Sequence, residues 1–286
     1  MPQFTHSIAR IAVWNLAGFQ FRNFNDPNWV PKPMSEERTA RQAEGLALLD
    51  AELVTLVEVN PLDHIQRLAD VLLAEYGVQY HVSILKQPDA DLNIGFLHKP
   101  GVDVSDIAFI PGSNGAYQNG RQAIKAQVRI GKFKAIIVGV HLKSGRDKGD
   151  QNIRDSQCKV IGDYLTHVRE TPGLGHHTLM LMGDFNMIPG QDVSNFHHLG
   201  GEDVMDFVSC WDLQDRYSHI LDAGRANLLD GFAVSRTWSG DYIRGSLRLF
   251  PMHWTMTRNG EPGMGREKFK EEVSDHLPFV ASVRIF

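Results

Sequence analysis

Short, continuously apolar segments constrain the fold of this chain more than any other feature of its sequence. They are the runs Ile8–Trp14, Leu53–Val57, Ala135–Val140, Leu179–Met182 and Phe279–Phe286. A strand with one solvent-exposed face alternates apolar and polar residues, whereas a strand covered on both faces can be apolar throughout. We therefore expect these runs to be interior β-strands of a layered protein.

Segments with helical spacing separate the strand-like runs. The clearest are Ser35–Asp50, Asp63–Tyr76 and Asn152–Glu170. The first begins with serine, a good N-cap residue, and carries two glutamates in its first turn, where the helix dipole favours negative charge. Asp192–Tyr217 is expected to be helical in pieces. Segments 20–34 and 240–272, rich in Pro, Gly, Asn and Arg, are expected to be long loops.

The composition is that of an ordinary globular protein. Of the 286 residues, 42% are hydrophobic and 22% are charged, and a chain of this length buries about three quarters of its unfolded surface. The sequence contains no internal repeat and no linker, so residues 1–286 are interpreted as one domain. No run approaches the roughly 18 apolar residues that suggest a membrane span.

Cysteine usage and the N-terminus favour a cytoplasmic location. The two cysteines, Cys158 and Cys210, are far apart and lack metal-type spacing. Reduced thiols are the preferred interpretation, and a single disulfide stays open. The N-terminal residues contain no basic segment leading into a long apolar core, so they do not resemble a signal peptide. Secretion after removal of a signal peptide stays an alternative.

The net charge of −5 argues against a protein that coats nucleic acid without sequence preference. Such binding depends on neutralised phosphates and favours a basic face. A local basic rim is compatible with this charge, because net charge says nothing about distribution. Nucleic acid therefore stays open as a partner without support from the charge, and the oligomeric state stays open too.

Polar residues stand at one end of each apolar run. The first four runs are followed by Asn15, Glu58, His141 and Asp184. The order is reversed in the last run, because Asp275 and His276 precede it. If the last strand is antiparallel to its neighbour, its start lies at the same edge of the sheet as the other strand ends. Residues distant in sequence would then form one polar rim on a rigid sheet, as in a catalytic site.

These residues also have ordinary structural explanations. An acidic residue after a strand is most often a turn former, and Asp184 alone would be interpreted so. Asp184 and Asn186, two apart in an extended segment, would point the same way, and Gly183 would let another group approach the backbone. Glu58 lies between two valines, where a carboxylate needs a partner. A metal ion would serve, and a buried arginine is the alternative.

His141 on its own would be interpreted as a core histidine. Lys143 and Ser144 follow it closely, which makes a polar set able to contact phosphate oxygens. Asp275 and His276 are adjacent and project differently, so the carboxylate can face a metal while the imidazole faces a substrate. The pattern therefore predicts chemistry on a phosphate ester.

Recognisable motifs occur in order along the chain. The strongest are VWN at Asn15, LVEV at Glu58, VHLKSG at His141, GDFN at Asp184–Asn186 and SDHLPF at Asp275–His276. Weaker ones are NIGFL with Asn93, GRQAIKAQV with Arg121, the Arg154/Gln157 pair, and LLDGFAVS with Asp230. From Ile8 to Phe286 the chain thereby resembles the endonuclease/exonuclease/phosphatase superfamily. That group includes DNase I-like nucleases, abasic-site endonucleases, neutral sphingomyelinases and inositol-polyphosphate 5-phosphatases.

The resemblance implies a four-layer α/β sandwich, in which two packed mixed β-sheets are flanked by helices (the DNase I-like fold). The chain departs from the family pattern in places. The family often has Gln before the metal-binding Glu, where this chain has Val57, and Asp230 follows Leu228–Leu229 rather than Arg-Ile. Segments 20–34, 111–120 and 240–272, where substrate-selecting loops are expected, match no particular subgroup.

The resemblance further implies a metal site. Glu58, with Asn15 and Asp275 nearby, is expected to hold the ion. Oxygen ligands favour Mg²⁺ or Mn²⁺, which keep some of their waters. Candidate substrate-binding residues are Asn93, Arg121 and Lys143.

The remaining motif residues are expected to carry out the reaction. Asp184 would orient and deprotonate the attacking water, and Asn186 would fix the position of that water. His276 would donate to a phosphate oxygen while Asp230 holds its tautomer and raises its pKa. His141 would stabilise the transition state or protonate the leaving group.

The leading interpretation is a divalent-metal-dependent phosphoester hydrolase, most directly a phosphodiesterase or nuclease. A phosphomonoesterase, or a lipid or small-molecule phosphodiesterase acting on inositol phosphates or sphingomyelin-like headgroups, is the rival within the same class. A non-catalytic binding module on the same fold is the rival from another class, and the intact set of motif residues argues against it. A purely structural domain would require every strand-end residue to be a coincidental cap.

Overall fold

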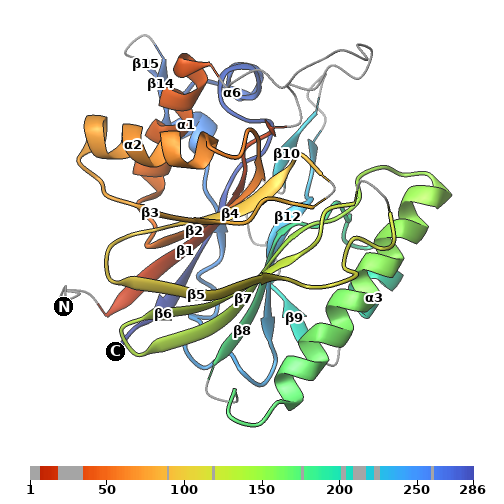
Figure 1. Ribbon diagram of the computed structural model, residues 1–286. Helices are drawn as coiled ribbons and strands as arrows, with labels where there is room; N and C mark the ends of the chain where they lie inside the picture. The colour runs from red at the N-terminus through yellow and green to blue at the C-terminus, as the bar shows by residue number, and fades with distance from the viewer. Residues whose placement is uncertain are drawn as a thin grey trace.

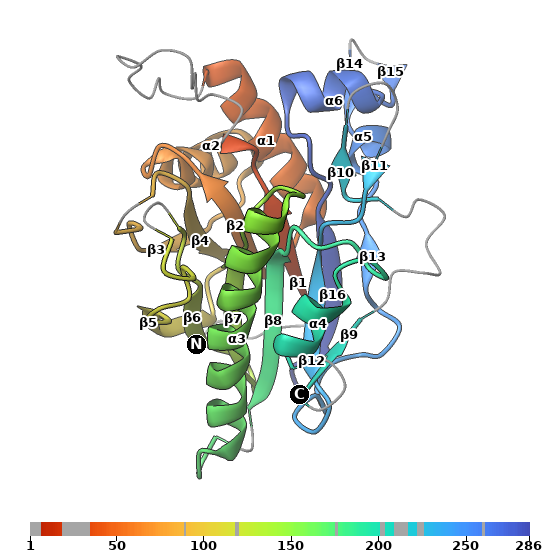
Figure 2. The same cartoon turned by 90° about the vertical axis from the view of Figure 1, so that its right-hand side faces the viewer.

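The computed structural model describes residues 7–18, 35–88, 90–117, 120–174, 177–200, 204–208, 217–221, 226–258 and 261–286. The expected loop 20–34, Cys210 and much of Asp192–Tyr217 lie outside these ranges. Within them, two β-sheets are stacked face to face, with helices on the outer sides (Figure 1 and Figure 2).

The first sheet contains the first and last long strands of the chain. Its order is β13 (Arg248–Leu249), β16 (Phe279–Arg284), β1 (Ile8–Asn15), β2 (Leu53–Val59), β4 (Asn93–His98) and β3 (His81–Ile84). β1 and β2 are parallel, whereas β16 is antiparallel to β1, with Phe279 opposite Val13. The start of β16 therefore lies near the end of β1, as the reversed order of polar residues in the last run predicts.

The second sheet carries the other half of the rim. Its order is β5 (Val102–Phe109), β6 (Ile124–Ile130), β7 (Phe133–His141), β8 (Thr178–Asp184), β12 (Asp230–Ser235) and β9 (Met205–Phe207). β7 and β8 are parallel, with His141 opposite Asp184. β12 is antiparallel to β8, so its first residue, Asp230, also lies opposite Asp184.

The core lies between the sheets and beneath the helices. The Thr55 hydroxyl of β2 donates to the Met182 sulfur of β8 at 3.2 Å. The helices α1 (Glu36–Leu49) and α2 (His64–Tyr76) cover the first sheet, and α3 (Lys148–Glu170) and α4 (Val193–His198) cover the second (Figure 1, Figure 2). This order of helix, sheet, sheet and helix is the four-layer sandwich that the sequence predicts.

Capping residues set the helix boundaries. The Ser35 side chain accepts the backbone N–H of Arg38 at the start of α1. Gly77 ends α2 with a left-handed φ of 66°. Helix α3 begins at Lys148 rather than at Asn152, because the Asp147 side chain caps it by accepting the backbone N–H of Asp150.

The expectation that 240–272 is a long loop is wrong. The segment contains β13, α5 (Met252–Thr255), β14 (Thr257–Arg258), β15 (Glu261–Pro262) and α6 (Arg266–Glu272). Each is too short to give a periodic signal. Met252 and Phe269 are fully buried, so tertiary packing rather than local propensity stabilises these pieces. The short strands β10 (His219–Ile220) and β11 (Ala226–Asn227) escape a sequence pattern for the same reason.

Two further expectations concern thiols and membranes. Cys158 on α3 is a free, buried thiol, and burial raises its pKa. In the ranges that the structure describes, no helix is both long and apolar enough to cross a membrane.

Candidate active site

The predicted rim is formed where the two sheets meet. The first sheet contributes Asn15 from the end of β1 and Glu58 from the end of β2. The second contributes His141, Asp184 and Asp230. All five side chains are buried, between 0% and 8% exposed, so their mutual contacts rather than solvent determine their chemistry.

Two carboxylates, an amide and an imidazole meet at the centre of this rim. The Asn15 side-chain amide donates to Glu58 Oε1 at 3.3 Å and to Asp184 Oδ2 at 3.1 Å. His141 Nε2 lies 3.4 Å from Glu58 Oε1 and 3.7 Å from Asp184 Oδ2. Ligand atoms of Glu58, His141 and Asp184 all lie within 4.8 Å of one another, close enough to share a cation.

The chemistry of this donor set fits a divalent metal. Two buried carboxylates repel each other, and a cation between them removes that cost. Asn15 Oδ1 accepts the backbone N–H of Ala17 at 2.9 Å, so its amide N–H group is turned toward Glu58 and Asp184. In this arrangement Asn15 orients the two carboxylates.

Unusual backbone conformations place the residues of this cluster. Glu58 has a left-handed φ of 58° and Asn186 one of 50°, a region that costs non-glycine residues on the order of 1–3 kcal/mol. At Gly18 an added Cβ would lie 2.1 Å from the Glu58 carbonyl oxygen, and at Gly183 2.0 Å from that of Val140. Both positions therefore require glycine.

The segment from Asp184 to Asn186 is not extended, contrary to the expectation from sequence. Asp184 Oδ1 accepts the backbone N–H of Asn186 at 2.9 Å, and the Asn186 side-chain amide donates to the Leu142 carbonyl at 3.1 Å. The turn fixes one oxygen of Asp184 and leaves the other facing the cluster. The Asn186 side chain supports the loop that follows β7.

His276 and Asp230 form a second group beside this cluster. His276 Nδ1 and Asp230 Oδ2 are 2.7 Å apart. The His276 backbone N–H donates to the Ser274 hydroxyl at 3.0 Å, and its carbonyl accepts the Trp14 indole N–H at 2.8 Å. Ser274 in turn donates to the Asn15 carbonyl at 2.7 Å. The loop before β16 is thereby tied to the end of β1.

Burial and neighbouring charges separate the ionisation behaviour of these groups. Burial, followed by the charge of Asp230, raises the pKa of Asp184 to about 7. Burial, with smaller effects of Arg121 and His276, lowers the pKa of His141 well below 6.5. His141 therefore faces the carboxylates as a neutral ring and not as an ion-pair partner.

The pKa of His276 shifts the opposite way. Burial alone would lower it, but the charge and hydrogen bond of Asp230, with the charges of Asp275 and Asp184, raise it well above 6.5. His276 is thus held as an imidazolium whose Nδ1–H donates to Asp230. Its Nε2 lies on the side of Asp275, 3.8 Å from Oδ1. The site thus combines an aspartate whose pKa is raised to about 7 with a histidine whose pKa is raised well above 6.5.

Asp275 lies on the His276 side of the rim. Its Oδ2 is 3.5 Å from His219 Nε2, and its Oδ1 is 3.8 Å from His276 Nε2. Among the described residues, Asp275 lies within 4.8 Å of ligand atoms of His219 and His276, whereas Glu58 belongs to the separate group with His141 and Asp184.

The weaker candidates support the surrounding loops. Arg121 donates through Nε to the His141 carbonyl at 3.2 Å and through Nη2 to that of Leu142 at 2.9 Å. Asn93 donates to the Val59 carbonyl at 3.0 Å, immediately after Glu58. Both residues hold the backbone next to a site residue.

Lys143 lies at the outer border of the site. Its ammonium group forms an ion pair with Asp150 at 2.6 Å and lies 5.8 Å from the ring centroid of Tyr117. The Arg154/Gln157 pair supports the same loop. Arg154 donates to the Lys143 carbonyl at 2.7 Å, and the Gln157 side-chain oxygen accepts the backbone N–H of Lys143 at 2.8 Å.

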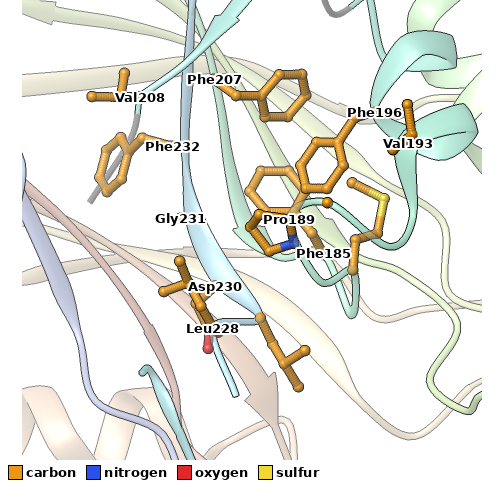
Figure 3. Close-up of a pocket in the computed structure, with 13 residues that line it drawn as sticks. Phe185, Pro189, Val193, Phe196, Phe207, Val208, Leu228, Asp230, Gly231 and Phe232 are labelled. Carbon is orange, nitrogen blue, oxygen red and sulfur yellow. The ribbon is translucent and has the colours of Figure 1, made fainter. Parts of the chain in front are cut away.

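An apolar cavity of about 390 Å³ adjoins the site at Asp230. Figure 3 shows the aromatic rings of Phe185, Phe196, Phe207 and Phe232 around it. No sequence pattern predicts this cavity, because its walls come from the loop after β8 and from α4, β9 and β12, which are distant in sequence. Ser218 and His219 beside His276 also lack a sequence signal, since Ser218 directly precedes, and His219 begins, a strand of only two residues.

No protein-family model matches the sequence, and a search of curated proteins finds no match. Solved structures do resemble it. D. rerio TDP2 complexed with a single-strand DNA product has a TM-score of 0.64 and 18% identity, over 98% of this chain and 100% of that chain. The human Nocturnin catalytic domain with bound sulfate has a TM-score of 0.66 and 16% identity, over 97% of this chain and 94% of that chain. The 3′ phosphatase NExo from Neisseria, bound to a product DNA hairpin, has a TM-score of 0.60 and 16% identity, over 96% of this chain and 98% of that chain.

Two stacked mixed sheets with helices outside and a polar site at their shared rim define a DNase I-like α/β sandwich. This is the fold of the endonuclease/exonuclease/phosphatase superfamily, the group of these structural neighbours. The fold that the sequence motifs imply is thereby confirmed over nearly the whole chain.

Proposed function

We propose that the chain is a divalent-metal-dependent phosphoester hydrolase that acts on phosphodiesters. One observation carries the proposal: the buried cluster of Glu58, His141 and Asp184 adjoins the Asp230–His276 pair through Asp184. A phosphoester is anionic, so its hydrolysis needs positive charge, an aimed nucleophile and a proton source. The two groups together supply these.

Glu58 is the proposed principal ligand for Mg²⁺ or Mn²⁺, and Asn15 holds its carboxylate in place. Asp275 is proposed as a further ligand from the His276 side. When bound, the ion would polarise a phosphate oxygen and offset developing negative charge. The oxygen-rich donors and their burial are the features that support this assignment.

Asp184 is the proposed general base. It takes a proton from the attacking water as the oxygen bonds to phosphorus, and its pKa of about 7 suits proton transfer near neutral pH. Asn186, whose backbone N–H holds Asp184 Oδ1, keeps that carboxylate in one orientation. The bond from phosphorus to the leaving oxygen breaks, and that oxygen receives a proton.

His276 and His141 are proposed to serve the phosphate from different sides. The imidazolium of His276, held by Asp230, donates through Nε2 to a phosphate oxygen. Neutral His141 is the proposed hydrogen-bond donor to the transition state. A neutral imidazole is too weak an acid to protonate the leaving oxygen, so the His276 imidazolium is the proposed source of that proton. Arg121 is proposed to add positive charge to the wall of the site, and Asn93 and Lys143 are proposed to assist at its border.

The names of the structural neighbours favour a nucleic-acid ester. One is complexed with a single-strand DNA product, and two are a 3′ phosphatase and a 2′,3′-cyclic phosphatase. The net charge of −5 favours a short or end-bound substrate over a long duplex, since few phosphates would be neutralised. Lipid headgroups and inositol phosphates stay as competing substrates.

A substrate panel tests this function. The protein is incubated with each substrate in the presence of Mg²⁺, Mn²⁺ or EDTA. The substrates are single-stranded DNA, RNA, DNA with 3′ phosphate, abasic duplex, bis(p-nitrophenyl) phosphate, sphingomyelin and inositol phosphates. Hydrolysis should require the metal, and Asp184→Asn should lower kcat by about 10²- to 10⁴-fold. Asp103→Asn, an exposed carboxylate paired with Arg129, is the matched control and should retain full rate. Turnover in EDTA, or near-normal turnover of Asp184→Asn, would contradict the mechanism.

A further inference from the structure

A short segment, Ser218–Ile220, lies against the loop that carries His276. The Ile220 backbone N–H donates to the Asp275 carbonyl at 2.7 Å, and the Ser218 carbonyl accepts the Leu277 N–H at 2.7 Å. His219 and His276 are thus bridged as antiparallel partners. Residues Ser218–Ile220 therefore form a short antiparallel β-ladder with residues Asp275–Leu277.

The same segment also holds Asp230. The Ser218 side chain is fully buried, and its hydroxyl accepts the backbone N–H groups of Leu229 and Asp230, each at 3.0 Å. One serine thereby connects the strand that begins at Asp230 to the loop that carries His276. The distance between these two residues depends on this connection.

His219 adds a contact to the reactive ring itself. Its imidazole stacks on that of His276, with centroids 4.6 Å apart and planes at 28°. Its Nε2 faces Asp275 Oδ2 at 3.5 Å, and its side chain is 19% exposed. Asp230 holds one edge of the His276 ring and His219 covers one face, so rotation of the ring about its side-chain bonds is restricted from two directions.

We propose that His219 is a positioning residue for His276: its ring fixes the plane in which His276 presents Nε2 to the phosphate. The proposal rests on the proposed function. A hydrogen bond at Nδ1 permits the ring to swing about that bond, whereas a flat neighbour on its face does not. Catalytic groups must be held within about 0.5 Å and 10–20° of their working geometry by such packing.

The effect of stacking can be separated from the polar edge of His219. Its Nδ1 is buried and has no hydrogen-bond partner among the described residues, so a carbon at that position loses no hydrogen bond. Phenylalanine keeps a flat ring over His276 but cannot contact Asp275 through nitrogen. Asparagine keeps a polar group and removes the ring.

The test compares His219→Ala, His219→Phe and His219→Asn in full steady-state kinetics on the best substrate of the panel. His219→Ala and His219→Asn should lower kcat about tenfold to a hundredfold with KM nearly unchanged, because misplacement by about 1 Å has effects of this size. His219→Phe should restore most of kcat. His81→Ala is the matched control, since His81 also pairs with a histidine ring, that of His98 at 5.5 Å, but on edge strand β3.

A second measurement does not depend on turnover. Imidazole ¹⁵N–¹H correlation spectra should show a single sharp His276 ring signal in the wild type and in His219→Phe, and a broadened or shifted one in His219→Ala. If the wild type is inactive on every substrate but the His276 signal still changes in His219→Ala, the proposed function is contradicted. The role of His219 in positioning His276 then still holds. Unchanged kcat and unchanged His276 signals in folded His219→Ala would overturn the positioning. So would failure of His219→Phe to restore either readout.

Discussion

Asp184 lies between the two halves of the site. It contacts the amide of Asn15 and faces the neutral ring of His141 on one side. On the other side it lies opposite Asp230 in the strand ladder. Burial raises the pKa of Asp184, and the nearby charge of Asp230 raises it further. This explains how Asp184 can serve as a base near neutrality.

The raised pKa of Asp184 predicts a specific dependence of stability on pH in EDTA. Burial, with the charge of Asp230, raises the pKa of Asp184 in the folded protein to about 7, whereas the ordinary pKa of an aspartate is 3.8. Between these values the folded state binds more protons than the unfolded state, so the contribution of Asp184 to stability is lost as pH rises.

Urea denaturation of wild type and Asp184→Asn across this pH range measures the contribution. The free energy of unfolding of the wild type should fall relative to that of the variant as pH rises. Mg²⁺ should reduce the difference, because a cation stabilises the carboxylate. Parallel pH profiles of the two proteins in EDTA would show that Asp184 titrates at an ordinary pKa.

Among the elements, α1 organises the site from behind. Gln42 on this helix is fully buried. Its amide donates to the carbonyls of Leu16 at 3.0 Å and Val273 at 2.9 Å, and its oxygen meets His64 Nε2 at 2.7 Å. One side chain thus joins the end of β1, the start of α2 and the loop before β16. Burial lowers the pKa of His64 to about 3, so the ring is neutral and can donate to Gln42.

Gln42→Ala should therefore destabilise the protein and impair the site together. Leaving buried carbonyls without donors costs about 1–3 kcal/mol each, so a loss of roughly 2–5 kcal/mol is expected from chemical denaturation. The matched control is Gln66→Ala on α2, an exposed glutamine that bonds Asp70 within its own helix, and it should change stability by less than about 0.5 kcal/mol. Equal effects of the two substitutions would remove the organising role of Gln42.

For the whole molecule, the decisive feature is that the site is divided between two sheets. Asn15 and Glu58 belong to the first sheet, while His141, Asp184 and Asp230 belong to the second. The cluster exists only when the sheets are packed, so the unfolded chain offers no comparable site. A cation that binds there must stabilise the folded state.

Thermal unfolding should show this coupling. Mg²⁺ at about a hundred times its Kd should add about 2.7 kcal/mol to the free energy of unfolding, and EDTA should remove it. Glu58→Gln should abolish the increase in Tm, whereas Glu75→Gln, an exposed residue near the end of α2, should retain it. A Tm that does not respond to Mg²⁺ or Mn²⁺ in the wild type would contradict the metal site.

Much of this protein follows from local sequence. The apolar runs, the helices between them and the polar residue at the end of each run are properties of neighbouring residues, so periodicity and capping reveal them. The order Asn15, Glu58, His141, Asp184 and His276 is enough to predict one rim, because strand direction determines which ends meet. The motifs predict the pairing of His276 with Asp230, and the structure places the two in contact.

The contacts between groups could be known from the folded structure alone. The turn at Asn186, the place of Asp275 beside His219, and the aromatic cavity next to Asp230 depend on strand register and on close packing between distant segments. Such contacts have no periodic signature, because each is made by residues that are neighbours in space alone. Local sequence was sufficient to predict the architecture and the chemical groups of the site. The packing of two sheets determined their distances, their protonation and therefore their proposed roles.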